Sequence, residues 1–168
     1  ISERLVDDIS IEHQEFSLII SKDSVYIPRL RKQNNLVSVN KNIELNADGV
    51  YIITGGLGGL GLKTAEVLVQ EGAKKIVLIG RNKPDTFAKP LLDSWAKLGV
   101  QIEVCNLDIS HFEALYVALQ KTNELQPIKG IFHCAGTLED GLIENQTWES
   151  FNKVFQSKVK GAFYLDQI

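Results

Sequence analysis

Apolar and polar positions alternate in blocks along most of the chain. From Gly49 onward, four short apolar runs predict strands, and they are VYIIT, KIVLIG, IEVCNLD and GIFHCAG. VYIIT is continuously apolar, which is typical of a parallel strand covered on both faces. Segments of helical spacing separate them, from Leu60 to Gln70 and from about Pro90 to Leu98, each followed by a glycine. This alternation predicts a doubly wound α/β sheet of parallel strands, incomplete within this chain.

Two further helices are predicted from capping signals. Ser110 follows the third run, and an acid three positions later predicts a capping box that starts a helix there. Thr147 is predicted to cap a helix that continues through Phe155. Helical spacing then resumes from Lys158 to Leu165.

Residues 1–46 follow a different pattern. EFSLII and SVYIPRL are β-branched or aromatic runs separated by SKD, which predicts a β-hairpin. The polar, asparagine-rich stretch RKQNNLVSVNKNIELNADG predicts a linker. We therefore expect residues 1–46 to form a separate segment with a linker, and residues 47–168 to form the α/β domain.

The composition narrows the class of protein. The 168 residues are 44% hydrophobic and 23% charged with a net charge of −3, so neither a nucleic-acid nor a membrane partner is expected. The cysteines, Cys105 and Cys134, match no zinc motif, and we expect buried free thiols and no metal site. No secretory signal is visible, so a cytoplasmic location is expected. The lack of methionine indicates a piece of a longer polypeptide.

The first strand leads into TGGLGGLG, residues 54–61. A tight turn from a parallel strand into a helix directs backbone N–H groups and the positive end of the helix dipole at one point, where a pyrophosphate binds. The turn fits the general dinucleotide fingerprint, the short-chain reductase version and the sugar-epimerase version, and spacing does not choose among them. The candidate cofactor-binding residues of the turn are Thr54, Gly55, Gly56, Leu57, Gly58, Gly59, Leu60 and Gly61.

The end of the second strand favours NADPH over NADH. An NAD site needs an acid there for the ribose 2′-hydroxyl, whereas an NADP site needs a basic residue for the 2′-phosphate. Here Arg81 and Lys83 come first, and the first acid, Asp85, lies beyond Pro84. Arginine forms paired, charge-assisted hydrogen bonds to phosphate, so Arg81 is the predicted 2′-phosphate ligand.

Two more strand ends should lie at the same edge of the sheet. Asp108, followed by Ile109, ends the third strand, where its carboxylate either accepts from the adenine amino group or only precedes the Ser110 cap. Ala135 and Gly136 end the fourth strand, and their small size would let the backbone approach the ribose and nicotinamide. The neighbouring histidine is assigned no acid–base role.

These residues together resemble the ketoreductase (KR) domain of polyketide and fatty acid synthases, a branch of the short-chain dehydrogenase/reductase superfamily. The resemblance covers roughly residues 25–168. It rests on VYIPRL, on YIITGGLGGLGLKTAEVLVQEGAKKIVLIGRN, on CNLDIS and on GIFHCAGTLEDGLIENQTWESFNKVFQSKVKGAFYLDQ.

The resemblance implies a function and a domain organisation. Residues 1–46 would be the tail of the KR structural subdomain, and residues 47–168 the N-terminal part of its Rossmann-like catalytic subdomain. The implied reaction is the NADPH-dependent reduction of a β-ketoacyl thioester carried by the phosphopantetheine of an acyl carrier protein. The implied partners are that carrier protein and neighbouring synthase domains, and the choice between a polyketide and a fatty acid pathway stays open.

The resemblance also implies one catalytic residue. Lys158, in SKVKG, matches the lysine whose ammonium lowers the pKa of the catalytic tyrosine and passes on a proton. The catalytic serine and tyrosine of the family are expected after Ile168, so this piece is expected to be inactive alone. Tyr164 lies on the same predicted helix as Lys158 and is too close to replace that tyrosine.

Some positions depart from the KR pattern. Residues 137–141, TLEDG, resemble the motif of B-type reductases, with Glu139 in place of its first aspartate and Asp140 as its second. Gly80 replaces a usual serine or threonine, and Asn82 a common second arginine. Two other interpretations stay open. One is a non-catalytic nucleotide-binding remnant within a synthase; the other is an extended-family sugar-nucleotide epimerase, which the upstream hairpin disfavours.

Overall fold

The computed structural model describes residues 19–21, 24–30 and 45–168, in two units that comprise residues 1–42 and 43–168. In the first unit, β1 (Ile19–Ile20) pairs antiparallel with β2 (Val25–Tyr26), which confirms the hairpin. The amide of Ser21 donates to the carbonyl of Ser24 at 2.8 Å and closes the turn. The predicted linker lies largely outside the described residues, and the assignment of residues 1–46 to a structural subdomain stays a prediction.

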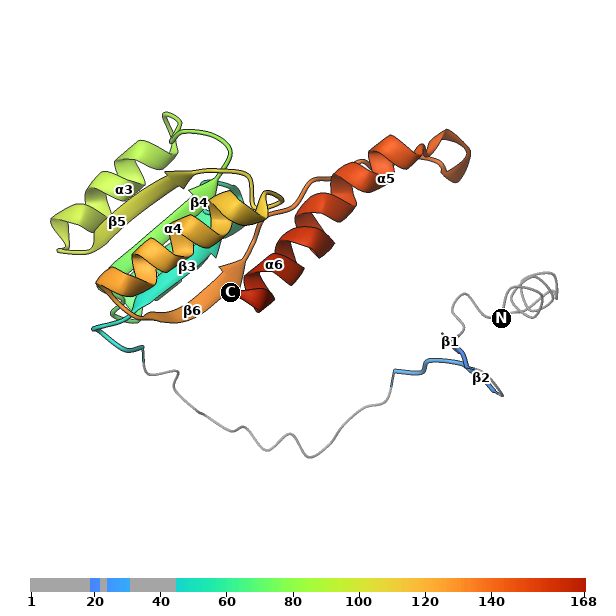
Figure 1. Cartoon of the computed structure of the whole chain (residues 1–168), viewed down its shortest axis with the longest axis horizontal. Helices are drawn as coiled ribbons and strands as arrows, with labels where there is room; N and C mark the ends of the chain where they lie inside the picture. The colour runs from blue at the N-terminus through green and yellow to red at the C-terminus, as the bar shows by residue number, and fades with distance from the viewer. Residues whose placement is uncertain (1–18, 22–23, 31–44) are drawn as a thin grey trace. The chain divides into compact units, whose positions relative to one another are not determined.

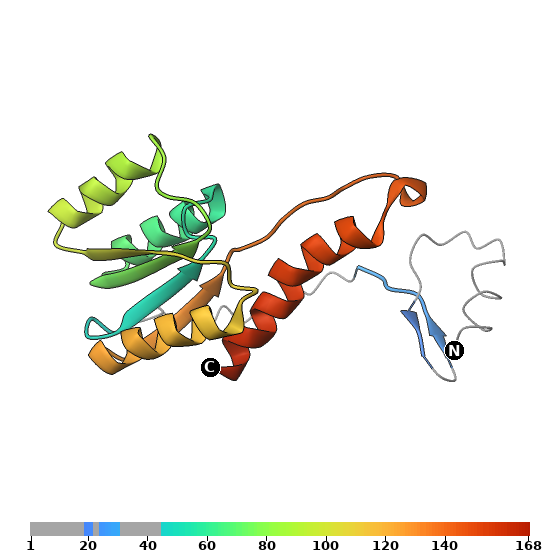
Figure 2. The ribbon, with the colours of Figure 1, turned by 45° about the horizontal axis from the view of Figure 1, so that its top comes forward.

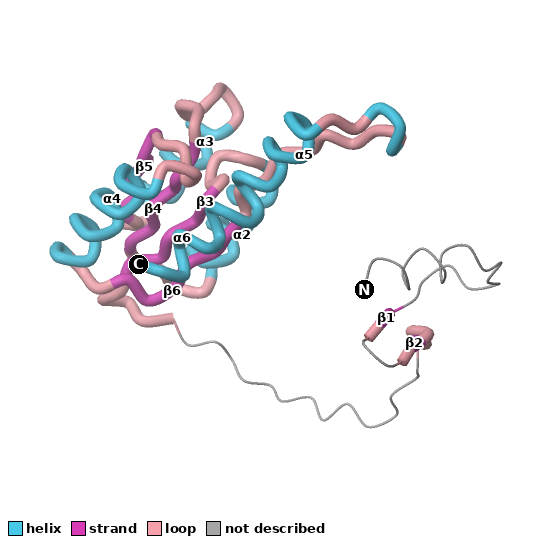
Figure 3. Tube along the Cα trace, turned by 45° about the vertical axis from the view of Figure 1, so that its right-hand side comes forward, coloured by secondary structure: helices cyan, strands magenta, loops and turns pink. Residues whose placement is uncertain are grey.

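The second unit contains the predicted parallel sheet. Its four strands are β3 (Val50–Thr54), β4 (Lys75–Gly80), β5 (Gln101–Asn106) and β6 (Ile128–His133). They pair in the order β5-β4-β3-β6, all parallel, as neighbouring magenta segments in Figure 3. The chain winds outward from β3 to β5 and then returns to the other side of β3, so the topology reverses between β3 and β6. In open α/β sheets, ligands bind outside the carboxyl ends of the strands at such a switch point.

Helices cover both faces of this sheet (Figures 1 and 2). The helices are α2 (Gly59–Gln70), α3 (Ala88–Lys97), α4 (Phe112–Leu125), α5 (Trp148–Phe155) and α6 (Gly161–Gln167), with a 3-10 turn at Ile143–Asn145. Alternate residues of β3 point to opposite faces, as strand geometry requires. Tyr51 and Ile53 pack with the apolar residues of α2 and α3, whereas Val50 and Ile52 pack with those of α4 and α6. The doubly wound α/β prediction is confirmed.

One predicted helix start is wrong. Helix α4 begins at Phe112, with His111 as its N-cap and no side-chain capping bond, so Ser110 does not cap it. Instead, the amide of Ser110 donates to Asp108 Oδ1 at 2.9 Å. Asp108 thus forms an Asx turn, and the observed N-cap, His111, lies one residue after the predicted one.

Two other predicted starts are close to the observed ones. Thr147 caps α5 as expected: its hydroxyl accepts from the amide of Ser150 at 3.2 Å, and its own amide donates to Ser150 Oγ at 3.1 Å. Helix α3 begins at Ala88, two residues before Pro90. Asp85 Oδ1 accepts from the amide of Ala88 at 2.7 Å and so satisfies a free donor at that helix start.

The predicted interruption between Phe155 and Lys158 is not observed, because the helix continues through these residues. Residues Gln156–Lys160 form a π-helical turn that joins α5 to α6 in one ribbon (Figure 1). Gly161 follows this turn and lies so close to Ile109 that a Cβ atom would be 2.5 Å from Ile109 Cδ1. The glycine therefore allows the helix to approach the end of β5. No helix among the described residues is long and apolar enough to cross a membrane.

Candidate nucleotide-binding site

Three glycines of the 54–61 turn are required by the packing of the chain itself. Gly55 has φ +63°, and a Cβ there would lie 2.7 Å from the amide of Ala135. A Cβ on Gly56 would lie 2.8 Å from Leu78 Cβ, and one on Gly61 would overlap the carbonyl oxygen of Gly55. These positions hold the turn against β4, β6 and the start of α2.

The other two glycines of the turn have a different environment. A Cβ on Gly58 would be 3.3 Å from the Gly55 carbonyl oxygen, and one on Gly59 would meet no atom within 4 Å. Helix α2 begins at Gly59, so its first amides have no acceptor within the helix. These amides and the helix dipole favour an anion beside the turn. Internal packing does not explain Gly59, whereas the close approach of a phosphate would.

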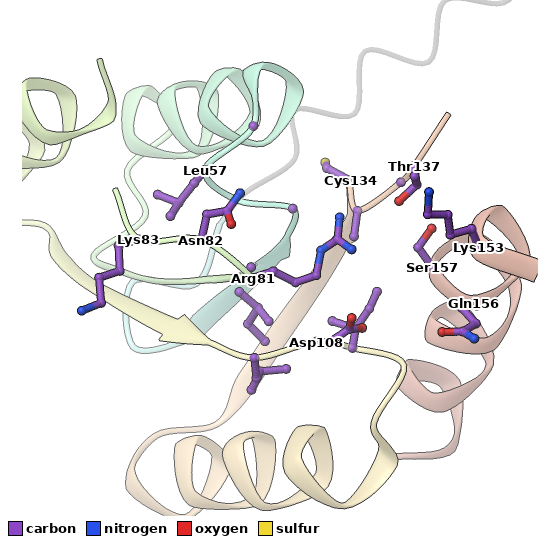
Figure 4. A pocket seen from close by; sticks show the side chains of 18 of the residues that line it. Leu57, Arg81, Asn82, Lys83, Asp108, Cys134, Thr137, Lys153, Gln156 and Ser157 are labelled. Atoms are coloured by element: carbon purple, nitrogen blue, oxygen red, sulfur yellow. The ribbon is translucent and has the colours of Figure 1, made fainter. Parts of the chain in front are cut away.

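A pocket of about 410 Å³ lies over the carboxyl ends of the four parallel strands (Figure 4). It brings together candidates from four separate stretches of sequence. Those that line it are Gly55, Leu57, Gly58, Arg81, Asp108, Ile109, Ala135 and Gly136. The candidates outside its lining are Thr54, Gly56, Gly59, Leu60, Gly61 and Lys158. Leu60 points its side chain to solvent with 68% exposure, so only its backbone can take part in phosphate binding.

Thr54 does not line the pocket but bonds a residue that does. Its side chain is fully buried, and its hydroxyl lies 2.7 Å from His133 Nδ1 and accepts from the amide of Ala135 at 3.3 Å. These contacts join the ends of β3 and β6, so Thr54 fixes where the backbone of Ala135 enters the pocket. His133 is exposed rather than buried, and the Thr54 hydroxyl is its partner.

Charge is concentrated where β4 and β5 end. Arg81 extends into the pocket, and Lys83, which also lines the pocket, directs its ammonium away from Arg81 (Figure 4). Partial burial would raise the pKa of Asp108, but hydrogen bonds from Ser110, together with the Arg81 charge, hold it below its ordinary value. Asp108 is therefore a carboxylate at neutral pH, and both roles considered for it are compatible: one oxygen accepts from Ser110 while the residue lines the pocket.

The far end of the pocket contains residues that the sequence analysis missed. Lys153, Gln156 and Ser157 line it from the last helix, opposite Gly136 and Thr137. Their spacing of i, i+3 and i+4 marks a single helix face and was a usable signal.

The loop beside these residues is held to the helix by polar contacts. Lys153 Nζ lies 2.6 Å from Glu139 Oε1, and Gln146 Nε2 donates to the carbonyl of Glu139 at 3.1 Å. Glu139, which departs from the B-type motif, therefore anchors the loop that contains it to the last helix.

Lys158 lies on the π-helical turn next to the end of β6. A Cβ atom on Gly136 would be 3.4 Å from Lys158 Cε, so the lysine side chain packs directly against that glycine. Tyr164 takes another direction, since its ring packs edge-on against Phe112 with centroids 5.2 Å apart. The Tyr164 ring is thus packed against α4, and the expectation that Tyr164 does not replace the catalytic tyrosine stays a prediction.

The remaining reactive side chains form no second site within the described ranges. Both cysteines are free thiols, as predicted, but they are half-buried rather than buried. Burial, and then the nearby Glu103, raises the pKa of Cys105. No cluster of three or more histidine, cysteine or acidic side chains in residues 19–21, 24–30 and 45–168 could hold a metal ion.

Known proteins with similar sequence are large synthases. Residues 49–168 match the family model described as KR domain. The chain is 36% identical over 168 residues to a 6-methylsalicylic acid synthase of Arthrobotrys oligospora, covering 90% of this chain and 10% of that protein. It is 37% identical over 125 residues to a highly reducing polyketide synthase of Gibberella zeae, covering 73% of this chain and 5% of that protein.

Solved structures agree with this match. An A-type ketoreductase from a modular polyketide synthase superposes with a TM-score of 0.78 at 27% identity, over 98% of this chain and 35% of that one. A ketoreductase domain from the bacillaene assembly line has the same TM-score at 26% identity, over 99% and 39%. The chain therefore spans a tenth or less of these two synthases and about a third of the solved ketoreductase chains.

Proposed function

The chain belongs to the ketoreductase (KR) domain family of polyketide synthases, and on that basis we propose that it forms the cofactor-binding part of an NADPH-dependent β-ketoacyl reductase. One observation carries the proposal: the glycine turn, Arg81, Asp108 and the end of β6 line a single pocket at the switch point of the sheet. The substrate would be a β-ketoacyl thioester on an acyl carrier protein.

The residues present fit a dinucleotide phosphate. The pyrophosphate would bind the amides at the start of α2, where Gly58 and Gly59 leave room for it. Arg81 would hold the 2′-phosphate, since its guanidinium extends into the pocket beside the ends of β4 and β5. The Asp108 carboxylate would accept from the adenine amino group with the oxygen that does not face Ser110.

The other end of the pocket suits the nicotinamide. NADPH, when bound, supplies hydride to the carbonyl carbon of the β-ketoacyl group. Ala135 and Gly136 would let the ring lie close to the end of β6, with Thr54 fixing the backbone there. Lys158, packed against Gly136, would hold its ammonium beside the reacting carbonyl, lower the pKa of the family's catalytic tyrosine and pass it a proton.

Partners follow from the same proposal. The carrier protein would deliver the thioester to the end of the pocket lined by Thr137 and Lys153, which lies opposite the Arg81 end. Neighbouring domains of a multifunctional synthase would supply the ketone and take up the alcohol. The configuration of that alcohol, for which the Glu139 loop resembles the B-type motif, stays a prediction.

The test is an assay of the reductase with its natural downstream sequence. We would extend the chain past Ile168, confirm that a serine and a tyrosine are present there, and follow NADPH oxidation with a soluble β-ketoacyl thioester. Turnover with NADPH that is faster than with NADH is the expected result. An extended protein that contains both residues but oxidises no NADPH would favour the non-catalytic remnant instead.

A further inference from the structure

Strands β4 and β5 leave the sheet side by side, with Gly80 and Asn106, their last residues, in register. Two hydrogen bonds then follow one another from β5 to β4. The amide of Leu107 donates to the carbonyl of Gly80 at 3.0 Å, and the side-chain Nδ2 of Asn106 donates to the carbonyl of Arg81 at 3.2 Å. The Asn106 side chain thus adds one more link between the strands after the backbone ladder has ended.

We propose that Asn106 is a positioning residue for the 2′-phosphate of the cofactor, because its side-chain amide holds the backbone of Arg81 at the mouth of the pocket. This inference rests on the proposed NADPH function and names the part of the chain that aims Arg81. Asn106 is exposed, and it is absent from the pocket lining within the described residues, so it acts through Arg81 rather than on the ligand.

The position of Arg81 makes such a contact important. Arg81 is the first residue after β4, at the start of the loop that leads to α3. Its backbone position decides where a long, flexible side chain starts, and fixing that start reduces the conformational freedom lost when phosphate binds. At its other end, the Arg81 charge interacts with Asp108. Two residues at and just after the end of β5 therefore interact with Arg81. Asn106 bonds its backbone carbonyl, and Asp108 interacts with its charge.

The test compares binding of NADPH and NADH by the 168-residue chain with four variants. They are Asn106→Ala, Arg81→Ala, the double variant, and Gln101→Ala as a control. Gln101 is also an exposed polar residue of β5 but lies at its opposite end. Dissociation constants would be measured by titration calorimetry and folding by thermal unfolding.

We expect Asn106→Ala to weaken NADPH binding about three- to tenfold, the range for one lost hydrogen bond, and to leave NADH binding and the unfolding temperature nearly unchanged. In the Arg81→Ala background, Asn106→Ala should add nothing, and Gln101→Ala alone should have no effect. Equal weakening of both cofactors by Asn106→Ala, or a loss that persists without Arg81, would overturn the inference.

The same titrations separate this inference from the proposed function. A wild-type chain that binds NADPH no more tightly than NADH would remove the 2′-phosphate role of Arg81, and the role of Asn106 with it. A wild-type chain that prefers NADPH, with that preference intact in Asn106→Ala, would remove the role of Asn106 alone.

Discussion

The two ends of the pocket differ in what holds them in place. At the Arg81 end, backbone hydrogen bonds join the glycine turn and the strand exits. The amide of Gly56 donates to the carbonyl of Ile79 at 3.2 Å, directly beside the core. At the Lys153 end, the wall is a loop and a helix held by exposed side chains, chiefly the Glu139 ion pair.

Because of this difference, substitutions at the two ends should affect different properties, folding stability at one end and turnover at the other. Ile79 is completely buried, so changes in the glycine turn act on the same core that holds the sheet together. Changes at the Lys153 end disturb exposed contacts, which open locally at little cost in global stability. We therefore expect substitutions of the packed glycines at the Arg81 end, Gly55, Gly56 and Gly61, to lower folding stability as well as cofactor affinity. Substitutions at the Lys153 end should change turnover while the protein stays folded.

The largest effect is expected for Lys158→Ala, at the exposed end. In the extended reductase it should lower kcat by about 10²- to 10⁴-fold, because it removes the group proposed to pass the proton. The unfolding temperature and the affinity for NADPH should change little. Stopped-flow or steady-state measurement of NADPH oxidation gives kcat, and fluorescence titration gives the affinity.

Lys160→Ala is the matched control for this substitution. Lys160 lies two residues away on the same π-helical turn, but its Nζ is 5.5 Å from the ring centroid of Tyr164 rather than beside Gly136. Its removal should leave kcat within about twofold of wild type, since a cation–π contact at an exposed site contributes only ~0.5–1 kcal/mol to folding. A similar loss of kcat in both variants would mean that the turn as a whole, and not Lys158, is required.

The second prediction compares two glycines of the same turn. Gly61→Ala should destabilise the second unit by about 2–4 kcal/mol, because the new Cβ would collide with backbone atoms of Gly55 and Gly56. Gly59→Ala should leave stability unchanged or slightly higher, since its Cβ would enter open space at a helix start. The Gly59 variant should instead bind NADPH about tenfold more weakly, because the methyl group would stand where the phosphate approaches.

Urea unfolding followed by tryptophan fluorescence measures this difference. Trp95 is buried in the core of the second unit at 5% exposure and reports its unfolding, whereas Trp148 is 75% exposed. Equal stability of the two variants would contradict the account of the turn. Unchanged NADPH affinity in Gly59→Ala would show that the phosphate does not pass over that residue.

The third prediction concerns the pH dependence of folding stability, which involves Asp108 at the Arg81 end. The pKa of Asp108 is held below its ordinary value, so the ionised carboxylate stabilises the fold. That stabilisation is present above the unfolded-state pKa and is lost as the pH falls through the lower folded-state pKa. Asp108→Asn keeps an oxygen that can accept from Ser110, so it should be slightly less stable than wild type at pH 7. The two proteins should converge as the pH falls below about 3.8, the ordinary value for aspartate.

Asp108→Ala separates the hydrogen bond from the charge. It removes the acceptor of the Ser110 amide as well and should cost about 1 kcal/mol at pH 7, more than Asp108→Asn. A difference between wild type and Asp108→Asn that stays constant down to pH 3 would show that the charge contributes nothing to folding.

The sequence predicted the buried end of the site better than the exposed end. Continuous apolar runs located β3 and β4 because strands buried on both faces leave few alternatives, whereas β5 and β6, at the edges of the sheet, are only partly buried. GIFHCAG, residues 130–136, nevertheless starts two residues after the start of the observed β6 and ends three residues after its end, since β6 runs from Ile128 to His133. The run extends past the strand because Ala135 leaves the sheet to bond the Thr54 hydroxyl, a contact between residues far apart in the chain.

The Lys153 end of the site was predicted less well, because it depends on contacts that the spacing of hydrophobic residues does not encode. The π-helical turn inserts an irregularity into helical spacing, so the pattern weakened at Gln156 although the helix continues. Glu139 and Lys153 are fourteen residues apart, and their pairing requires the intervening loop to fold back. Ser110 failed as a cap for a local reason, since Asp108 competes for its amide and forms a turn instead.

The smallest expected effect tests whether the exposed end is held by its ion pair. Lys153 and Glu139 side chains are 65% and 30% exposed, and such pairs contribute only about 0.2–1 kcal/mol to stability. In a double-mutant cycle of Lys153→Ala and Glu139→Ala, we expect a coupling energy in that range that shrinks when salt is raised from about 0.05 to 0.5 M. Because the pair holds the loop beside the proposed nicotinamide end, both single variants of the extended reductase should raise KM for the thioester by the same factor and leave NADPH affinity unchanged. Coupling in stability without any change in KM would mean that the loop is anchored there but does not guide the substrate.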